Sequence, residues 1–169
     1  MTLALRSFGA GDVRALGAVL APAFAAGDTY AVPTDLTPAQ AAAWWTAPGK
    51  TVFLAEEEAK LLGTYYIRAN AEGPGDHVCN CGFVTDRAAR GQGVASAMLA
   101  HSLDEARRLG YRGMQFNAVV ATNAGAIRLW ERAGFDTVGR VPGAFRHPVH
   151  GHVDTLIMFK SLTEDQDAR

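Results

Sequence analysis

The residues whose types and spacing could carry out chemistry lie between Asp86 and Ala95. A strand-like run ends at Thr85, and the chain then reads Asp-Arg-Ala-Ala-Arg-Gly-Gln-Gly-Val-Ala, with a helical pattern from Val94. Glycines let the backbone come close to a ligand, and the first N–H groups of a helix point at any anion placed there. Arg90 adds a permanent charge and a forked set of donors. The pattern predicts a site for a pyrophosphate group.

Two other phosphate-binding motifs match this loop less well. The dinucleotide fingerprint needs Gly or Ala where this chain has Ser96, and an acidic residue at the end of the next strand. That strand ends Val-Val-Ala-Thr-Asn at Asn123, with no carboxylate to hold a ribose hydroxyl. A Walker loop fails because no Gly-Lys-Ser/Thr follows.

An alternation of strands and helices must position this loop. Apolar residues at period two predict strands near residues 3–8, 51–55, 61–69, 77–85, 114–120, 135–141 and 153–160. Helical spacing predicts helices near 13–26, 38–45, 94–109 and 124–133. Asp12, Thr37 and Asn123 stand at the starts of helices as capping residues, and Gly110 and Gly134 at helix ends. The order describes a mixed α/β unit.

The composition is that of a globular domain. The 169 residues carry 16 Lys+Arg against 17 Asp+Glu, a net charge of -1, and 49% of them are hydrophobic. No basic cluster is present, so we expect no nucleic-acid partner. The chain has no internal repeat, low-complexity linker or change of composition. We expect a single domain over residues 1–161 and a frayed tail over 162–169.

The sequence also bears on cellular location. The apolar stretch Ala15–Ala26 follows the charged residues Asp12 and Arg14, so we interpret it as a helix of the fold rather than a signal-peptide core. No apolar run is long enough to span a membrane, and no membrane partner is expected. Cys79 and Cys81 are two apart on a predicted strand, where a disulfide between them would be strained. Buried thiols in a reducing, cytoplasmic setting are the expectation.

The glycine loop resembles the acetyl-CoA loop of the GCN5-related N-acetyltransferases, the GNAT family. That loop reads Gln/Arg-x-x-Gly-x-Gly/Ala at the start of a helix, and Arg90-Gly91-Gln92-Gly93-Val94-Ala95 matches it at each position. A second family element is an Asn that begins the following helix, which then ends Leu-Tyr-x-x-x-Gly-Phe. Here these are Asn123 and Leu129-Trp130-Glu131-Arg132-Ala133-Gly134-Phe135. The resemblance extends from Phe83 to Phe159.

The resemblance implies the GNAT fold, an α/β fold whose central, mostly antiparallel mixed sheet has a splayed pair of parallel strands and about four flanking helices. It implies acetyl-CoA as co-substrate, with its pantetheine arm between the splayed strands, and no metal. Backbone groups of Phe83 and Thr85 would bind that arm like an added strand. The residues implied for cofactor binding are Phe83, Val84, Thr85, Arg90, Gly91, Gln92, Gly93, Val94, Ala95, Asn123 and Trp130. A helix cap is the alternative role of Asn123, and core packing that of Trp130.

The general acid and general base are unassigned. Many family members have, at the position of Trp130, a tyrosine proposed to protonate the CoA thiolate, and an indole N–H cannot act as that acid. A thiol with a pKa of about 8.5 can instead take its proton from solvent or from the substrate ammonium. Asn80 stands on the strand where the family often has Glu. Asn117 is our candidate for orienting the acceptor, with a structural role in the sheet as the alternative.

The sequence gives fewer signals for the acceptor site than for the cofactor site. Tyr30 and Tyr66 lie in the N-terminal half, where the family builds that site. The segment 141–154 holds three histidines and an aspartate, the ingredients of a metal site, but its spacing favours solvated loop histidines. Arg146 could pair with an acceptor carboxylate, and His147 could form a pocket wall or relay protons. The candidate substrate residues are therefore Tyr30, Tyr66, Arg146 and His147.

These features predict an N-acetyltransferase that transfers an acetyl group from acetyl-CoA to the amine of a small molecule. An amino acid or an amino-acid analogue would attack directly in a ternary complex. One alternative is a catalytically silent acyl-CoA-binding module, which the missing Tyr and Glu keep open. The other is an enzyme that acetylates peptides or proteins. Homodimers are common in the family, and the resemblance leaves that state open.

Overall fold

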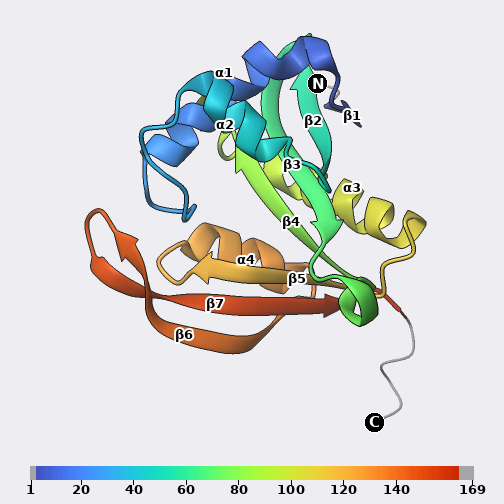
Figure 1. Ribbon diagram of the computed structural model, residues 1–169, viewed down its shortest axis with the longest axis vertical. Helices are drawn as coiled ribbons and strands as arrows, with labels where there is room; N and C mark the ends of the chain where they lie inside the picture. The colour runs from blue at the N-terminus through green and yellow to red at the C-terminus, as the bar shows by residue number, and fades with distance from the viewer. Residues whose placement is uncertain (1–2, 164–169) are drawn as a thin grey trace. The chain divides into compact units, whose positions relative to one another are not determined.

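Seven strands and four α-helices make up the described part of the chain, residues 3–163 of the computed structural model (Figure 1). The strands are β1 (Ala4–Ser7), β2 (Thr51–Glu57), β3 (Lys60–Ala69), β4 (Val78–Thr85), β5 (Gly113–Val120), β6 (Asp136–His147) and β7 (Gly151–Ser161). The helices are α1 (Val13–Ala25), α2 (Pro38–Trp45), α3 (Val94–Arg108) and α4 (Ala124–Arg132). This order confirms the predicted alternation. None of the described helices has the length and apolarity needed to cross a membrane.

The strands form a seven-stranded sheet in the order β1-β2-β3-β4-β5-β7-β6. The pairs β1–β2, β2–β3, β5–β7 and β6–β7 are antiparallel, and β4–β5 is parallel. In the parallel pair, Val78 lies opposite Gly113 and Cys79 opposite Met114. A mixed sheet with a parallel pair is the predicted fold class.

The described residues fall into two compact units. The first contains the residues up to Arg68 together with Gly82–Asp104, and the second contains Ala69–Cys81 and the residues from Glu105 onward. The single domain expected over residues 1–161 stays a prediction. The frayed tail expected over 162–169 falls mostly on residues 164–169, outside the described part of the chain.

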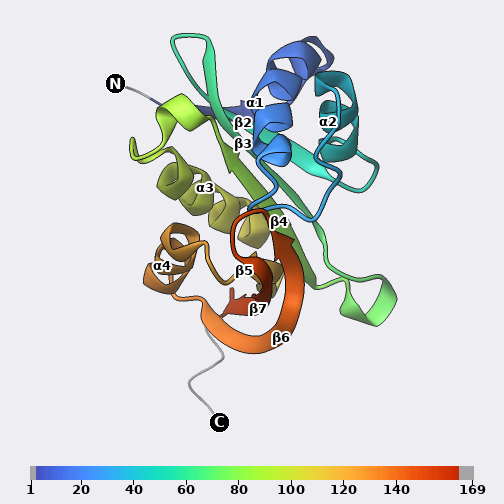
Figure 2. The ribbon, with the colours of Figure 1, turned by 90° about the vertical axis from the view of Figure 1, so that its left-hand side faces the viewer.

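In the first unit, α1 and α2 lie side by side and pack on β2 and β3 (Figure 2). Leu16, Leu20 and Phe24 repeat at the helical spacing that predicted α1, and each is at most 1% exposed. They pack with Trp45 of α2 and Leu54 of β2 in one hydrophobic cluster. The apolar face of α1 therefore packs against α2 and holds it in position.

The start of α2 is fixed by the predicted capping residues. The Thr37 hydroxyl accepts from the N–H of Gln40 at 3.3 Å, and the Gln40 side chain accepts from the N–H of Thr37 at 2.9 Å. At the other end, the Trp45 indole N–H donates to the Thr64 hydroxyl at 3.1 Å, which donates to the carbonyl of Phe53 at 2.8 Å. Both ends of this short helix are thus held by hydrogen bonds.

In the second unit, an aromatic cluster joins α4 to β5. Phe116 stacks on Phe135 with 4.5 Å between ring centroids, and its centroid lies 4.8 Å from that of Trp130. Because side chains alternate along a strand, Phe116 faces α4, and Gln115 and Asn117 face the opposite side of β5.

The last two strands are longer than predicted. We expected strands near 135–141 and 153–160 with a loop between them, but β6 and β7 continue through that segment as a hairpin that turns between His147 and Gly151 (Figure 1). The segment contains Pro142 and Gly143, which lie where the pairing of β6 with β7 shifts register between Val141 and Phe145. Proline is tolerated in a strand at the edge of a sheet, and β6 is such a strand.

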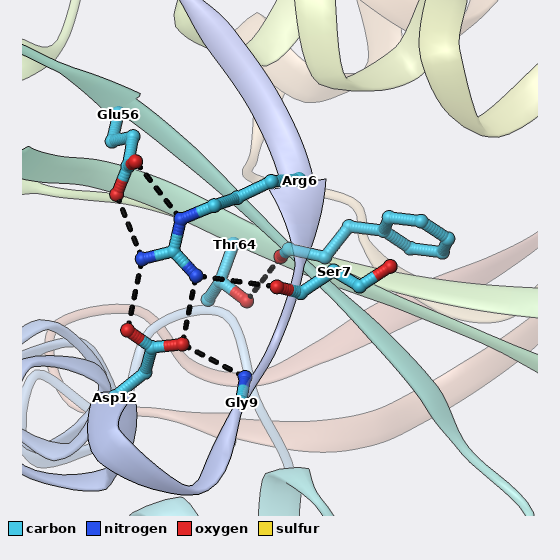
Figure 3. A network of polar contacts seen from close by, with 7 residues as sticks. Arg6, Ser7, Gly9, Asp12, Glu56 and Thr64 are labelled. Atoms are coloured by element: carbon cyan, nitrogen blue, oxygen red, sulfur yellow. Dashed lines mark hydrogen bonds and ion pairs between the residues drawn. The ribbon is translucent and has the colours of Figure 1, made fainter.

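A polar network ties β1 to β2 and to the turn before α1 (Figure 3). The Arg6 guanidinium donates to the carboxylates of Glu56 at 2.9 Å and Asp12 at 2.8 Å. Asp12 was expected to cap α1 but makes no side-chain capping bond to that helix. Its carboxylate accepts from Arg6 and from the N–H of Gly9 instead, and these bonds, led by those from Arg6, lower its pKa to about 2.

Gly17 of α1 should tolerate no side chain. A Cβ at this position would lie 2.4 Å from the carbonyl oxygen of Pro38, a backbone atom that cannot rotate away. We expect Gly17→Ala to lower the free energy of unfolding by about 1–3 kcal/mol in urea denaturation. Gly125→Ala is the matched control, because it is also helical and its Cβ would meet nothing within 4 Å. Equal stability of the two variants would disprove the close approach.

The Arg6 network predicts a dependence of stability on acid pH. Because the pKa of Asp12 falls from 3.8 to about 2 on folding, its charge stabilises the fold above pH 3.8, and this contribution is lost as the pH falls toward 2. The groups are partly exposed, so Asp12→Asn should cost about 1 kcal/mol or less at neutral pH. Thermal melts should show the difference at pH 7 and a much smaller one near pH 2, where about half of the Asp12 carboxyl groups are protonated in the folded state. A difference that is undiminished at pH 2 would mean that Asp12 acts through something other than its charge.

Candidate functional site

The loop between β4 and α3 is fixed at both ends and exposed in the middle. At its start, the N–H of Asp86 donates to the carbonyl of Leu62 on β3 at 2.8 Å. Ala89 and Val94 are each 2% exposed, whereas the residues between them are exposed. The turn over residues 90–93 is therefore exposed, and the residues on either side of it are buried.

This turn has the backbone shape that the sequence predicted. Gly91 has φ 78° and Gly93 has φ 81°, in the left-handed region that glycine adopts without strain. A Cβ at either position would meet nothing within 4 Å, so the space beside both is open. The N–H of Ala97 donates to the carbonyl of Gly93 at 3.0 Å, and the earlier N–H groups have no acceptor within the helix. Such donors at the positive end of α3 match the needs of a pyrophosphate.

The polar side chains of the loop have different roles. Gln92 donates to the carbonyl of Ala88 at 3.0 Å, so its side chain braces the turn. Arg90 follows the short helical turn Arg87–Ala89 and is exposed. Arg90 can therefore add charge for an anion. Gln92 also donates its backbone N–H to the carbonyl of Ala89 at 3.3 Å, so its contact with a cofactor stays a prediction.

At the end of β4, every second residue points its backbone N–H and C=O groups toward β3. The N–H of Asp86 is bonded to β3, and a Cβ on Gly63 would approach the Val84 carbonyl oxygen to 3.0 Å. Because backbone direction alternates along a strand, Phe83 and Thr85 turn their groups away from β3. This is the orientation that strand-like binding of a ligand requires.

Tyr30 and Tyr66 belong to an aromatic cluster in the first unit. The ring centroid of Trp45 lies 5.7 Å from that of Tyr30 and 4.8 Å from that of Tyr66. A Cβ on Gly82 would lie 2.5 Å from the Tyr66 ring, and the Tyr30 hydroxyl donates to the carbonyl of Phe83 at 2.9 Å. Both predicted acceptor residues thus lie beside the end of β4.

Lys50 joins this cluster, although the sequence gives no signal for it. Its Nζ lies 3.8 Å from the ring centroid of Trp44 and 4.5 Å from that of Tyr66, and it donates to the Trp44 carbonyl at 2.8 Å. Burial, followed by the charge of Arg68, lowers the pKa of Lys50 to about 8. A larger share of Lys50 is therefore uncharged near neutral pH than of an exposed lysine.

In the second unit, Asn117 belongs to a chain of amide side chains. Its Nδ2 donates to Oδ1 of Asn70 at 2.7 Å, and Nε2 of Gln115 donates to its Oδ1 at 3.0 Å. These bonds fix the orientation of an exposed amide, as a positioning role requires. Asn70 was missed in the sequence because it lies 47 residues away.

Asn123 and Trp130 both fulfil the structural alternatives given for them. Oδ1 of Asn123 accepts from the N–H of Ala126 at 3.3 Å and so caps α4. The ring of Trp130 is 8% exposed and packs against Phe116. Contact of either residue with a cofactor stays a prediction.

Arg146 and His147 lie near the tip of the β6–β7 hairpin rather than in a loop. Arg146 is exposed opposite His152, and Nδ1 of His147 accepts from the N–H groups of Val149 and His150 at 3.1 and 3.3 Å. Across residues 3–163, no three His, Cys, Asp or Glu side chains gather in a way that could hold a metal ion. His147 therefore shapes the hairpin turn, and its role and that of Arg146 toward an acceptor stay predictions.

Cys79 and Cys81 are unpaired and buried, as predicted. They are 0% and 6% exposed. Burial raises the pKa of the Cys81 thiol, which therefore stays protonated and unreactive near neutral pH.

Known proteins share both the sequence and the fold. Residues 20–135 match the model of the acetyltransferase (GNAT) family. N-acetyltransferase aca1 of Schizosaccharomyces pombe is 37% identical over 123 residues, which are 72% of this chain and 59% of that protein. The chain thus spans little more than half the length of this relative.

Solved structures extend the match beyond the motif. A GCN5-related N-acetyltransferase from Kribbella flavida has a TM-score of 0.88 and 37% identity, over 94% of this chain and 97% of that one. A phosphinothricin acetyltransferase from Sinorhizobium meliloti in complex with AcCoA shares the fold, with a TM-score of 0.84 and 23% identity over 100% of this chain and 93% of that one. Because the family model matches residues 20–135, more than half of this chain, and the glycine turn lies before α3, the chain belongs to the GNAT acetyltransferase family.

Proposed function

We propose that this protein is an N-acetyltransferase that transfers an acetyl group from acetyl-CoA to the amine of a small molecule. The observation that carries the proposal is the open turn before α3, where Gly91 and Gly93 expose helix N–H groups to an anion. Family membership and the name of the S. pombe relative support the reaction class.

The chain offers complementary groups along the length of acetyl-CoA, which supplies an acetyl group already activated as a thioester. N–H groups of Gly93, Val94 and Ala95 would hold the pyrophosphate, and Arg90 would add charge beside it. Backbone groups of Phe83 and Thr85, which turn away from β3, would bind the amides of the pantetheine arm.

The acceptor amine must be neutral and correctly placed to attack. Asn117 is held by Asn70 and Gln115 and is our candidate for orienting the acceptor. Trp130 is no acid, because its indole only donates and its ring is packed in the core. Solvent can protonate the departing CoA thiolate, because the ordinary pKa of a thiol is about 8.5.

An amino acid or an amino-acid analogue is the acceptor class we propose. The fold shared with a phosphinothricin acetyltransferase is consistent with this class. An amide such as that of Asn117 can hydrogen-bond either a carboxylate or an amine. We also propose a cytoplasmic location, in keeping with two unpaired thiols.

CoA release, followed with a thiol reagent, tests the proposal directly. The panel comprises amino acids, cyclic imino acids, polyamines, aminoglycosides and short peptides. The two protein thiols are buried, so the reagent should report mainly free CoA. Turnover with one class of small amine is the expected result. Turnover with peptides alone would identify a protein acetyltransferase, and binding of acetyl-CoA without turnover would identify a binding module.

Gly93→Glu should abolish detectable acetyl-CoA binding, because it places a carboxylate in the proposed pyrophosphate site. Gly110→Glu is the matched control at the other end of α3. Its φ of 84° is close to the 81° of Gly93, and its Cβ would also meet nothing within 4 Å. Each variant should lose about 1–2 kcal/mol of stability through backbone strain. Isothermal titration calorimetry should show binding to the Gly110 variant only, and retained binding by Gly93→Glu would refute the site.

Variants of Asn123 separate its capping role from a cofactor role. Asn123→Ser keeps a capping oxygen, so its stability should stay within about 0.5 kcal/mol of the wild type, whereas Asn123→Ala should lose about 1 kcal/mol. If Asn123 also contacts acetyl-CoA, the Ser variant should bind acetyl-CoA more weakly at nearly unchanged stability. Unchanged affinity in Asn123→Ser would leave Asn123 as a cap alone.

A further inference from the structure

The Tyr30 hydroxyl is bonded to the backbone of β4 at the point where the proposed donor would bind. Tyr30 lies in the chain between α1 and α2, and its hydroxyl donates to the carbonyl oxygen of Phe83 at 2.9 Å, across 53 residues of sequence. A side chain from the region expected to bind the acceptor therefore reaches a backbone group expected to bind the donor.

The direction of the β4 backbone shows to which side the Phe83 carbonyl points. Val84 and Asp86 turn their backbone groups to β3, so the Phe83 carbonyl points away from β3. A ligand that adds to this edge like a strand needs that carbonyl as acceptor for one of its amide N–H groups. The hydroxyl and such a ligand would therefore use the same oxygen.

We propose that the Tyr30 hydroxyl competes with the amide-bearing arm of acyl-CoA for the Phe83 carbonyl, so that donor binding displaces Tyr30. The inference rests on the proposed function, since it assumes an acyl-CoA donor. Displacement frees a phenol in the segment between α1 and α2, where the acceptor is expected. Binding of the donor thereby makes the Tyr30 hydroxyl available to the acceptor.

Tyr30→Phe isolates the hydroxyl because the ring has its own contacts. The ring centroid lies 5.4 Å from that of Phe24 and 5.7 Å from that of Trp45, both edge-on. The variant should keep these contacts and lose the bond to Phe83. Tyr65→Phe is the matched control, since it loses a tyrosine hydroxyl bonded at 2.6 Å to His101 while its ring stacks on Phe83.

The test compares two ligands by isothermal titration calorimetry on the full chain. The first is acetyl-CoA, and the second is the 3′-phosphoadenosine diphosphate fragment of CoA, which keeps the pyrophosphate and lacks the arm. Tyr30→Phe should bind acetyl-CoA about two- to tenfold more tightly than the wild type, the size of one net neutral hydrogen bond, and should bind the fragment equally well. Tyr65→Phe should match the wild type for both ligands.

Unchanged or weaker binding of acetyl-CoA by Tyr30→Phe would overturn the competition, as would an equal gain for both ligands. A thermal melt of each variant checks that the fold is kept. If the wild type bound neither ligand, the proposed function would fail and this inference with it. Binding of acetyl-CoA by the wild type, without a selective gain in Tyr30→Phe, would reject this inference and leave the proposed function standing.

Discussion

The first N–H groups of α3 impose the constraint on which the proposed site depends. A helix cannot satisfy its own first donors, so they must meet a capping side chain, water or a ligand. This chain caps α2 with Thr37 and α4 with Asn123, each through a side-chain oxygen. Gly93 precedes α3 and has no side chain to offer. The first donors of this helix are therefore open to water or to an anion, as the proposed site requires.

Packing around the loop explains how an open turn stays in place. A Cβ on Gly63 of β3 would lie 2.9 Å from Met98 and 3.0 Å from Val94, so the missing side chain lets α3 pack closely on the strand. That contact holds the first turn of the helix, while the backbone bond from Asp86 to β3 holds the start of the loop. The missing side chain thus allows α3 to pack closely on β3 at Gly63, and leaves the start of α3 uncovered at Gly93. The contrast shows that the exposed turn is a specific feature of the fold.

The features that the sequence predicted correctly depend on residues close together in the chain. The capping pair Thr37 and Gln40, the cap at Asn123 and the glycine turn each lie within a few positions, where local geometry decides the structure. The family resemblance implied the parallel pair within a mostly antiparallel sheet, and the expected cofactor residues. The strands were predicted to end near 141 and to start again near 153, but β6 and β7 continue between them, because Pro142 is tolerated in a strand at a sheet edge.

Side-chain partners distant in sequence could not be predicted. Asn70 and Asn117 are 47 residues apart, and Tyr30 and Phe83 are 53 apart. No periodic pattern records such pairs, because they arise only when the strands and helices pack. The lowered pKa of Lys50 has the same origin, since burial and Arg68 on a neighbouring strand cause it. The sequence therefore predicted the glycine turn before α3, and the structure was needed to find the side-chain pairs distant in sequence.

Amide hydrogen exchange with and without saturating acetyl-CoA tests the central claim most directly. The account predicts slower exchange of the N–H groups of Gly93, Val94 and Ala95, because a bound pyrophosphate would accept from them. The N–H of Ala126, already capped by Asn123, should exchange at the same rate in both states. Saturable binding of acetyl-CoA that left exchange at the start of α3 unchanged would contradict the account.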